Sequence, residues 1–563
     1  MDEDSEAERL HIHTSSQRRP TLLSQAKASL LRLIAIAVLE RVAFYSIELN
    51  ALSSFSQSYT EFSDVITTAL STIFVGLSFA LAPLFGIVAD RKLGYYATLT
   101  VAFAFYTIAT SATCAVGRLL ESNSTYDQTR LDALRGVYLA SLVAFALSAA
   151  AVRATLVPYM LDHIEDEYRR RRRLLEKFCT FVYVAFNVSA TIGALASYVE
   201  LRHAAQPRLF WTYLVAPVAA FLALLLLIVG RKKYRKHRQR ADRCPNACTI
   251  LGMGFGCIRR LRRSRRHGNE QSNAQFAILM PVLVAVVFYR AVYSGIGMES
   301  FHEMFSHSDA YDNSKYANVT NGTTLTCPSA RFEPTLGHYA SFPPGLLELF
   351  DTISVLLSVP IVWYVLRPVY ERCVGKELDM LTRIHCGIFV VGLVVLGGVG
   401  VEVARRVGSG AIRFAYTCAT VGRRHCVEVV PYKTKLSPLA TLVPLYALTG
   451  LTEVLAVIAT MEFVLSRAPR ELRCTAYGVY NFAIGVGIYV GAAYREIARK
   501  EGFFFRSWSN CTTAAMATVV VPSYERSEMR AWIYFLGLVG LAFVNWAAFF
   551  CVKKRCRFVR LET

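Results

Sequence analysis

The sequence predicts an all-α membrane protein with twelve transmembrane helices in two bundles of six and with both termini in the cytosol. Three observations lead to this prediction: repeated long apolar segments, basic runs that alternate with them, and a polar stretch at the middle of the chain. Of the 563 residues, 54% are hydrophobic and only 18% are charged. This balance is typical of a protein with many membrane spans and argues against a soluble enzyme.

The apolar segments set the number of spans. A helix needs about 20 mostly apolar residues to cross the hydrocarbon core of a bilayer. Segments of this kind recur along the chain. We expect spans at 31–56, 65–89, 96–118, 134–160, 178–201, 209–230, 275–298, 345–366, 386–404, 439–465, 474–496 and 531–552.

The basic runs set the orientation. "RKLGYY" follows the second span, "EYRRRRRLLEK" the fourth and "RKKYRKHRQR" the sixth, and "KKRCRFVR" lies near the end of the chain. All of them fall on one side of the predicted topology, which the positive-inside rule makes cytosolic. A basic patch can also bind nucleic acid, but runs between spans favour contact with anionic lipid headgroups at the cytosolic face. We therefore expect no nucleic-acid partner.

Glycosylation sequons give an independent indication of the same topology. Asn123, Asn318, Asn321 and Asn510 all lie in loops that follow odd-numbered spans, and we expect them to be glycosylated on the non-cytosolic side. Asn187 also matches the sequon but lies inside the fifth span.

The spans divide six and six around a basic linker. We expect a cytosolic tail at 1–30, a first bundle at 31–230, the linker at 231–273, a second bundle at 274–552 with a glycosylated outer loop at 305–344, and a basic tail at 553–563. Two six-helix bundles joined by a cytosolic loop is the layout of the major facilitator fold, in which substrate binds near the midplane between the halves.

The cysteines indicate neither a disulfide scaffold nor a metal site. Cys327, Cys418, Cys426 and Cys511 are predicted to lie outside, where three pairings are open and a Cys418–Cys426 bridge is the simplest. The spacing of "CPNAC" at 244–248 has no second pair of ligands. No nucleophile–base set or phosphate loop is visible, so we predict no enzyme activity, no metal and no cofactor.

Charged residues inside the predicted spans point to the functional site. A charge at the bilayer centre costs about 2.5–3.5 kcal/mol on insertion scales, so such residues normally face a cavity or a partner. The first span holds adjacent Glu40 and Arg41, with Glu48 on the face of Arg41 about 10 Å further along the helix axis. Phe44 and Tyr45 lie one turn after the charged pair.

Three further charges lie in later spans: Arg153 in the fourth, Asp351 in the eighth and Glu453 in the tenth. Arg153 and Glu453 belong to opposite bundles. They are candidates for a gate ion pair, or for a clamp on the carboxylate and amine of a zwitterion. A structural ion pair is the alternative for any single one of these sites.

Several motifs, in order along the chain, resemble the proton-coupled oligopeptide transporter family, solute carrier family 15. "VLERVAFYS" resembles its E-x-x-E-R-F-x-Y-Y-G pattern, and "PLFGIVADRKLGYY" keeps G-x-x-A-D-x-x-L-G. "FVYVAFNVSATIG" is similar to F-Y-x-x-I-N-x-G-S, and "ELFDTISVLLSVPI" to the eighth-span pattern. "TEVLAVIATMEFVLSRAP" resembles G-E-x(8)-E-F-x-Y-x-x-A-P, with Glu453 and Glu462 nine residues apart.

The resemblance implies roles for individual residues. Arg41 would bind a peptide carboxylate or relay charge beside Phe44 and Tyr45, and Glu453 would receive the peptide amine. Asn187 matches the substrate-binding Asn of the family, although an amide in an apolar helix can equally bond a neighbouring helix. Glu40 and Glu453 are then the candidate proton acceptors.

The chain also departs from the family pattern. Ala37 replaces the first Glu of E-x-x-E-R, Glu48 replaces a basic residue, and Arg153 in "SAAAVRA" replaces a Lys. Asp351 stands in the place of an Asn. The seventh span carries Arg290 and lacks the Asp-Gln-Gln of the family, which indicates a divergent member near the peptide/histidine or orphan branches.

The sequence therefore predicts a secondary active transporter, a proton-coupled symporter of small peptides and/or histidine that works by alternating access. The alternatives are a facilitator of another small solute, without proton coupling, and a transporter-derived scaffold or receptor. Its substrate and protons would be its small-molecule partners. The plasma membrane and the endolysosomal membrane both remain open as locations.

Overall fold

The computed structural model is almost entirely helical. It describes residues 29–48, 64–122, 128–164, 172–203, 209–232, 234, 269–296, 344–408, 413–414, 416–421, 424–429, 438–501, 524–525 and 531–561.

The first half of the chain begins with helical residues 29–48, of which 47–48 have π-helical geometry. The helices that follow are α3 (Asp64–Ala80), α4 (Ala82–Val88), the π-helical η2 (Ala89–Leu93), α5 (Tyr95–Ser122), α6 (Gln128–Asp162), α8 (Arg172–His203) and α9 (Leu209–Val229).

The second half of the chain contains α11 (Asn269–Ile296), α13 (Pro344–Ile361), the π-helical η6 (Val362–Leu366), α14 (Arg367–Val374), α15 (Met380–Gly408), α16 (Pro438–Arg467), the 3-10 helix η7 (Arg470–Leu472), α17 (Arg473–Lys500) and α18 (Ala531–Leu561).

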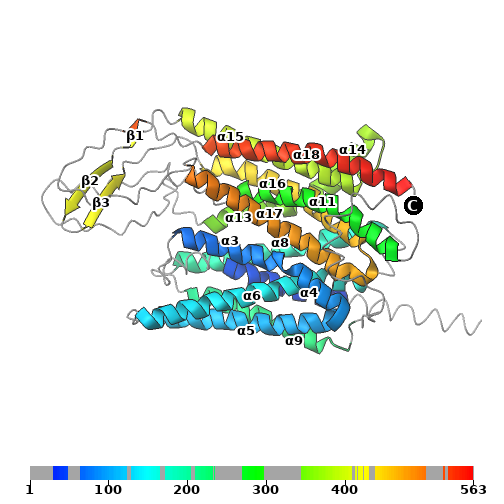
Figure 1. Ribbon diagram of the computed structural model, residues 1–563, viewed down its shortest axis with the longest axis horizontal. Coiled ribbons are helices and arrows are strands. Elements are labelled where there is room, and N and C mark those ends of the chain that lie inside the picture. The colour runs from blue at the N-terminus through cyan, green and yellow to red at the C-terminus, as the bar shows by residue number, and fades with distance from the viewer. Residues whose placement is uncertain are drawn as a thin grey trace, which may run out of the picture.

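Four short strands form two antiparallel pairs. β1 (Arg413–Phe414) pairs with β4 (Tyr524–Glu525), and β2 (Tyr416–Val421) pairs with β3 (Arg424–Val429). The sequence-based prediction treated these stretches as loops. In Figure 1 the strands lie beyond one end of the helices, and the C-terminus lies at the opposite end.

The helices of the two halves form two groups that run side by side (Figure 1). Within the first group α5 packs against α6 and α9; within the second, α15 packs against α16 and α18, and α11 against α17. The groups meet where α17 contacts α3, α4 and α6, and where α8 contacts α13 and α16. These helices therefore form the interface between the two halves.

Nine helical segments in the described part of the chain are long and apolar enough to cross a membrane. Each predicted span also overlaps a helix in the described part of the chain. However, the described residues of α8, α9 and 29–48 do not meet the same criteria of length and apolarity. The count of twelve spans stays a prediction.

The two halves pack closely against each other near α4 and the start of α17. A Cβ on Gly86 would lie 2.5 Å from the carbonyl oxygen of Cys474, and one on Gly478 would lie 2.8 Å from that of Ala82. Glycine at these two positions therefore lets the backbones approach closely.

The buried Asp90 carboxylate accepts hydrogen bonds of 3.2 and 2.7 Å from the backbone N–H groups of Cys474 and Thr475. An anion at a helix N-terminus is favourable because the N–H groups there lack intrahelical partners.

Candidate functional site

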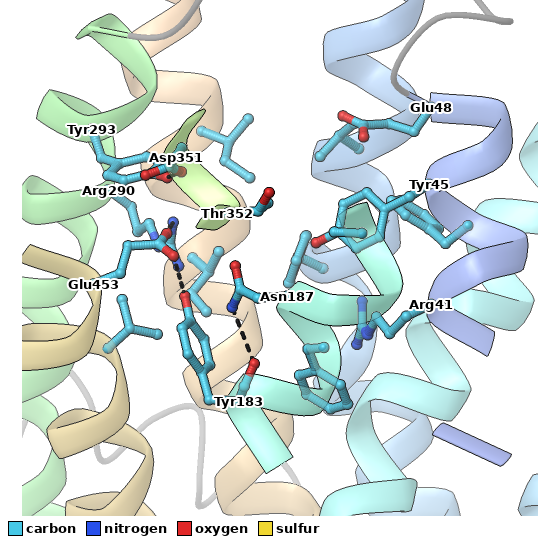
Figure 2. A pocket seen from close by; sticks show the side chains of 18 of the residues that line it. Arg41, Tyr45, Glu48, Tyr183, Asn187, Arg290, Tyr293, Asp351, Thr352 and Glu453 are labelled. Atoms are coloured by element: carbon cyan, nitrogen blue, oxygen red, sulfur yellow. Dashed lines mark hydrogen bonds and ion pairs between the residues drawn. The ribbon is translucent and has the colours of Figure 1, made fainter. Parts of the chain in front are cut away.

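A cavity of about 280 Å³ lies between the two halves of the molecule. Residues 29–48, α3, α6 and α8 form one wall, and α11, α13, α16 and α17 form the other. Figure 2 shows side chains of both walls converging on this space. All but one of the sequence-predicted substrate and coupling residues line it: Arg41, Phe44, Tyr45, Arg153, Asn187, Asp351 and Glu453. Glu48 lines it as well.

Glu40 is the exception among the predicted site residues. Its side chain is 1% exposed and does not line the cavity. Its Oε2 lies 3.2 Å from Arg41 Nε, and Tyr106 donates a 3.2 Å hydrogen bond to its backbone oxygen. Glu40 therefore lies behind Arg41, where it compensates the charge of that guanidinium. Proton acceptance by Glu40 stays a prediction.

Arg41 and the two aromatic residues after it form the wall contributed by the first helix. The guanidinium carbon of Arg41 lies 4.6 Å from the centroid of the Phe186 ring in α8. Phe44 is 1% exposed and packs against Phe74 and Phe145, with ring centroids 5.3 and 5.9 Å away. Phe44 and Tyr45 both line the cavity beside Arg41, and their role in binding a substrate stays a prediction.

Arg153 is held by aromatic rings. Its guanidinium carbon lies 4.4 Å from the Phe44 ring centroid and 3.8 Å from that of Phe79, and the residue is 4% exposed. Cation–π contacts of a desolvated guanidinium stabilise by roughly 2 kcal/mol. In this conformation Arg153 and Glu453, both of them described residues, form no ion pair. The predicted gate between them stays a prediction.

Glu453 is paired with a residue that the sequence analysis did not place in the site. Its Oε1 lies 3.5 Å from Nη1 of Arg290 in α11, and its Oε2 accepts a 2.5 Å hydrogen bond from the Tyr183 hydroxyl in α8 (Figure 2). Arg290 also lies 4.8 Å from the Tyr293 ring centroid. Glu453 thus joins three helices, one of them from the first half.

Asp351 and its neighbour Thr352 form a second polar contact region on α13. The Tyr293 hydroxyl donates a 2.7 Å hydrogen bond to Asp351 Oδ2. The Thr191 hydroxyl of α8, which packs against α13, donates a 3.0 Å hydrogen bond to the hydroxyl of Thr352. Asn187, one turn before Thr191, donates its amide N–H to the backbone oxygen of Tyr183 at 3.0 Å. This bond uses neither its side-chain carbonyl nor its second amide N–H.

Arg290, Tyr183 and Tyr293 are the site residues that sequence reasoning missed. Arg290 carried a signal, because it is a charge inside an apolar span, but the choice of partner depends on how the helices pack. The sequence gives no signal for the two tyrosines. The chain has 29 tyrosines, and tyrosine is common in membrane proteins without belonging to a binding site.

A separate charged cluster lies toward the end of the helices where the chain terminates. Glu176 in α8 lies 3.3 Å from Arg367 Nη1 and 3.1 Å from Arg383 Nη1, atoms of α14 and α15. Arg383 also donates to Glu462 of α16. These contacts tie the first half of the chain to the second and are buried or partly buried.

Several predictions lie outside the described residues. Asn123, Asn318, Asn321 and Asn510 are among these, and so are Cys327 and Cys511. The register of the β2–β3 pair puts Cys418 opposite Val427 and Cys426 opposite Ala419. The two cysteines are not directly opposed, and the predicted bridge stays a prediction. Within the described segments, no group of three His, Cys, Asp or Glu side chains could hold a metal ion.

A sequence model of the POT family matches residues 319–503 of the chain. Protein NRT1/PTR family 5.10 of Arabidopsis thaliana is 23% identical over 559 residues, covering 94% of this chain and 93% of that protein. Solute carrier family 15 member 3 of Mus musculus is 21% identical over 521 residues, covering 85% and 84%.

Solved structures share the fold. A crystal structure of an auto-inhibited POT family peptide transporter has a TM-score of 0.63 at 17% identity, covering 94% of this chain and 97% of that one. A POT family transporter in complex with 5-aminolevulinic acid has a TM-score of 0.58 at 13% identity, covering 94% and 96%.

Proposed function

We propose that the protein is a secondary active transporter of small peptides and/or histidine. The premise is that the family and fold of this chain are those of the POT transporters. POT transporters are not enzymes, so the site is read as a binding and translocation site. The proposed carrier couples uptake to protons and works by alternating access between two bundles of six spans.

The observation that supports this proposal best is the charge distribution of the cavity. Both halves contribute charges of both signs: Arg41, Glu48 and Arg153 from the first half, and Arg290, Asp351 and Glu453 from the second. A zwitterion bound between them contacts both halves, as a substrate that drives rocking of two bundles must do. The peptide transporters and the complex with 5-aminolevulinic acid named above are relatives whose ligands combine amine and carboxylate chemistry.

The arrangement of the ends supports the proposed topology. The α4 end, which precedes a predicted cytosolic loop, lies in Figure 1 at the end where the chain terminates, and the strands lie at the other end. Both termini, the linker 231–273 and the anionic-lipid contacts are accordingly proposed to be cytosolic, and the loop 305–344 to be outside. The plasma membrane and the endolysosomal membrane both fit this topology.

Proton coupling is proposed to act through Glu453. Protonation would remove its attraction for Arg290, which does not deprotonate in proteins, and would leave Arg290 able to move. This changes the contacts of α16 with α11 and α8, which come from different halves. A local charge change of this kind can bias a two-state element. Glu40, paired with Arg41, is the second proposed acceptor.

A facilitator without proton coupling is the second candidate, and two observations favour it. Ala37 is buried where the family pattern has a Glu, so one carboxylate is absent from the first helix. The remaining Glu453 is already compensated by Arg290. Both features weaken the case for a carboxylate that gains and loses a proton during each cycle.

Uptake into proteoliposomes of purified full-length protein tests the two candidates. Labelled histidine and a labelled dipeptide are offered with and without an inward proton gradient. Gradient-driven uptake that is lost in Glu453→Gln supports the symporter, and uptake indifferent to the gradient supports the facilitator. If neither probe enters, the proposed substrate class is wrong, and recruitment of partners by a transporter-derived scaffold becomes the better proposal.

A further inference from the structure

We infer that Asp351, rather than Glu453, receives the cationic group of the substrate, so that the carrier selects substrates with an unmodified ammonium group. This inference rests on the proposed function and specifies its substrate class. It departs from the role that the sequence motif suggested for Glu453, and it follows from which polar atoms of the cavity already have partners.

Both carboxylate oxygens of Glu453 are engaged within the protein. Oε1 faces Arg290 Nη1 at 3.5 Å, and Oε2 accepts the Tyr183 hydroxyl at 2.5 Å. The Glu453 side chain is only 8% exposed. A substrate ammonium would have to displace a permanently charged guanidinium to reach it and would leave that guanidinium without compensation.

Asp351 has one carboxylate oxygen that accepts no hydrogen bond from the described residues. Its Oδ2 accepts the Tyr293 hydroxyl at 2.7 Å, but its Oδ1 is buried and has no hydrogen-bond donor among the described residues. The residue lines the cavity, and in Figure 2 it lies on the wall that also carries Arg290 and Glu453. A buried acceptor without a donor is costly, and a charged donor from a ligand removes that cost with a stronger hydrogen bond than a neutral one.

Arg153 is the group that would bind the negative end of the substrate. Its Nε and Nη2 atoms are buried and lack acceptors within the described part of the chain, while Phe44 and Phe79 hold the plane of the guanidinium. Glu48 of the first helix also lines the cavity. The Arg290–Glu453 and Glu40–Arg41 pairs are each internally neutral, which leaves a cation on α6 and an anion on α13 facing a ligand from opposite walls. These two groups belong to different halves, so a single zwitterion can satisfy both.

The test compares a labelled dipeptide that has a free amino terminus with its N-acetyl form, in proteoliposomes of the full chain. Asp351→Asn removes the charge but keeps an oxygen that can accept the Tyr293 hydrogen bond. Asp132→Asn makes the same change at a side chain that is 60% exposed and far from the cavity lining, and is the matched control. The double variant Glu453→Gln with Arg290→Gln removes the internal pair together.

In Asp351→Asn we expect the KM of the free-amine dipeptide to rise about tenfold or more, from the loss of a charged hydrogen bond. The KM of the N-acetyl form should stay within about twofold, and Asp351→Glu should retain the preference for the free amine. The double variant should also retain it, measured as the affinity of the purified protein for the two dipeptides, because this variant lacks the proposed proton acceptor and is not expected to show gradient-driven uptake. Loss of the preference in the double variant but not in Asp351→Asn would overturn the inference and return the ammonium to Glu453. If the unmodified protein transports neither dipeptide, the proposed function itself fails and the inference falls with it.

Discussion

Tyr183 of α8 and Glu453 of α16 are joined by a 2.5 Å hydrogen bond across the interface between the two halves of the chain. The Tyr183 hydroxyl donates to a carboxylate that also faces Arg290 at 3.5 Å. Alternating access requires the halves to move against each other. The bond is therefore a contact whose strength depends on the charge of Glu453, and it connects the proposed proton site to the position of a helix in the other half.

The first prediction concerns this bond. Tyr183→Phe should reduce stability by about 1.5–3 kcal/mol, because a hydrogen bond to a charged group is lost. We expect a lower unfolding midpoint of the purified protein in detergent. Tyr183→Phe combined with Glu453→Gln should be scarcely less stable than Glu453→Gln alone, since both changes weaken one contact. Full additivity of the two effects would contradict the prediction.

The second prediction concerns the partner of Glu453. Arg290→Met should cost about 3–5 kcal/mol, because it leaves a buried carboxylate without a compensating charge. Adding Glu453→Gln to Arg290→Met should recover much of this loss. The yield of folded protein and the unfolding midpoint report both effects. Equal destabilisation of the single and double variants would mean that Arg290 acts through its packing alone.

Much of the helical layout was predictable, because membrane spans leave a local signal in the sequence. An apolar segment must form helix to satisfy its backbone in lipid, so the span at 439–465 corresponds to Pro438–Arg467 in the structure. The strands β2 and β3 were missed. The interpretation of 405–438 as a plain loop overlooked that "YTCATV" and "RHCVEV" are short segments rich in β-branched residues.

The composition of the site was predictable in part for the same reason. Arg41, Phe44 and Tyr45 share one region of one helix, so their spacing alone predicts that they line one wall. The partner of Glu453 was not predictable. It depends on how α11 and α6 approach α16, and both Arg153 and Arg290 are cations in apolar spans with no local feature that distinguishes them.

The third prediction concerns the aromatic setting of Arg153. Arg153→Lys keeps the charge but should raise the KM for a zwitterionic dipeptide by about tenfold, because an ammonium cannot present a planar pair of donors held between Phe44 and Phe79. Phe79→Leu should act in the same direction, since it removes the ring that lies 3.8 Å from the guanidinium carbon. Concentration-dependent uptake in proteoliposomes measures both. An unchanged KM in Arg153→Lys would show that charge alone is recognised.

The last prediction concerns the charged cluster between α8 and the second half. Arg383 contacts Glu176 of α8 and Glu462 of α16. Arg383→Gln should therefore leave two buried carboxylates with less compensation and favour separation of the halves at this end. Cys179, one turn after Glu176, is buried and reports on that separation. We expect a membrane-permeant maleimide to label Cys179 at least several-fold faster in Arg383→Gln, as quantified by mass spectrometry of its peptide.

Arg173→Gln is the matched control, because its 3.1 Å pair with Glu377 is 73% exposed on both sides and contributes little. Equal labelling rates in Arg383→Gln and Arg173→Gln would mean that the cluster does not hold the two halves together.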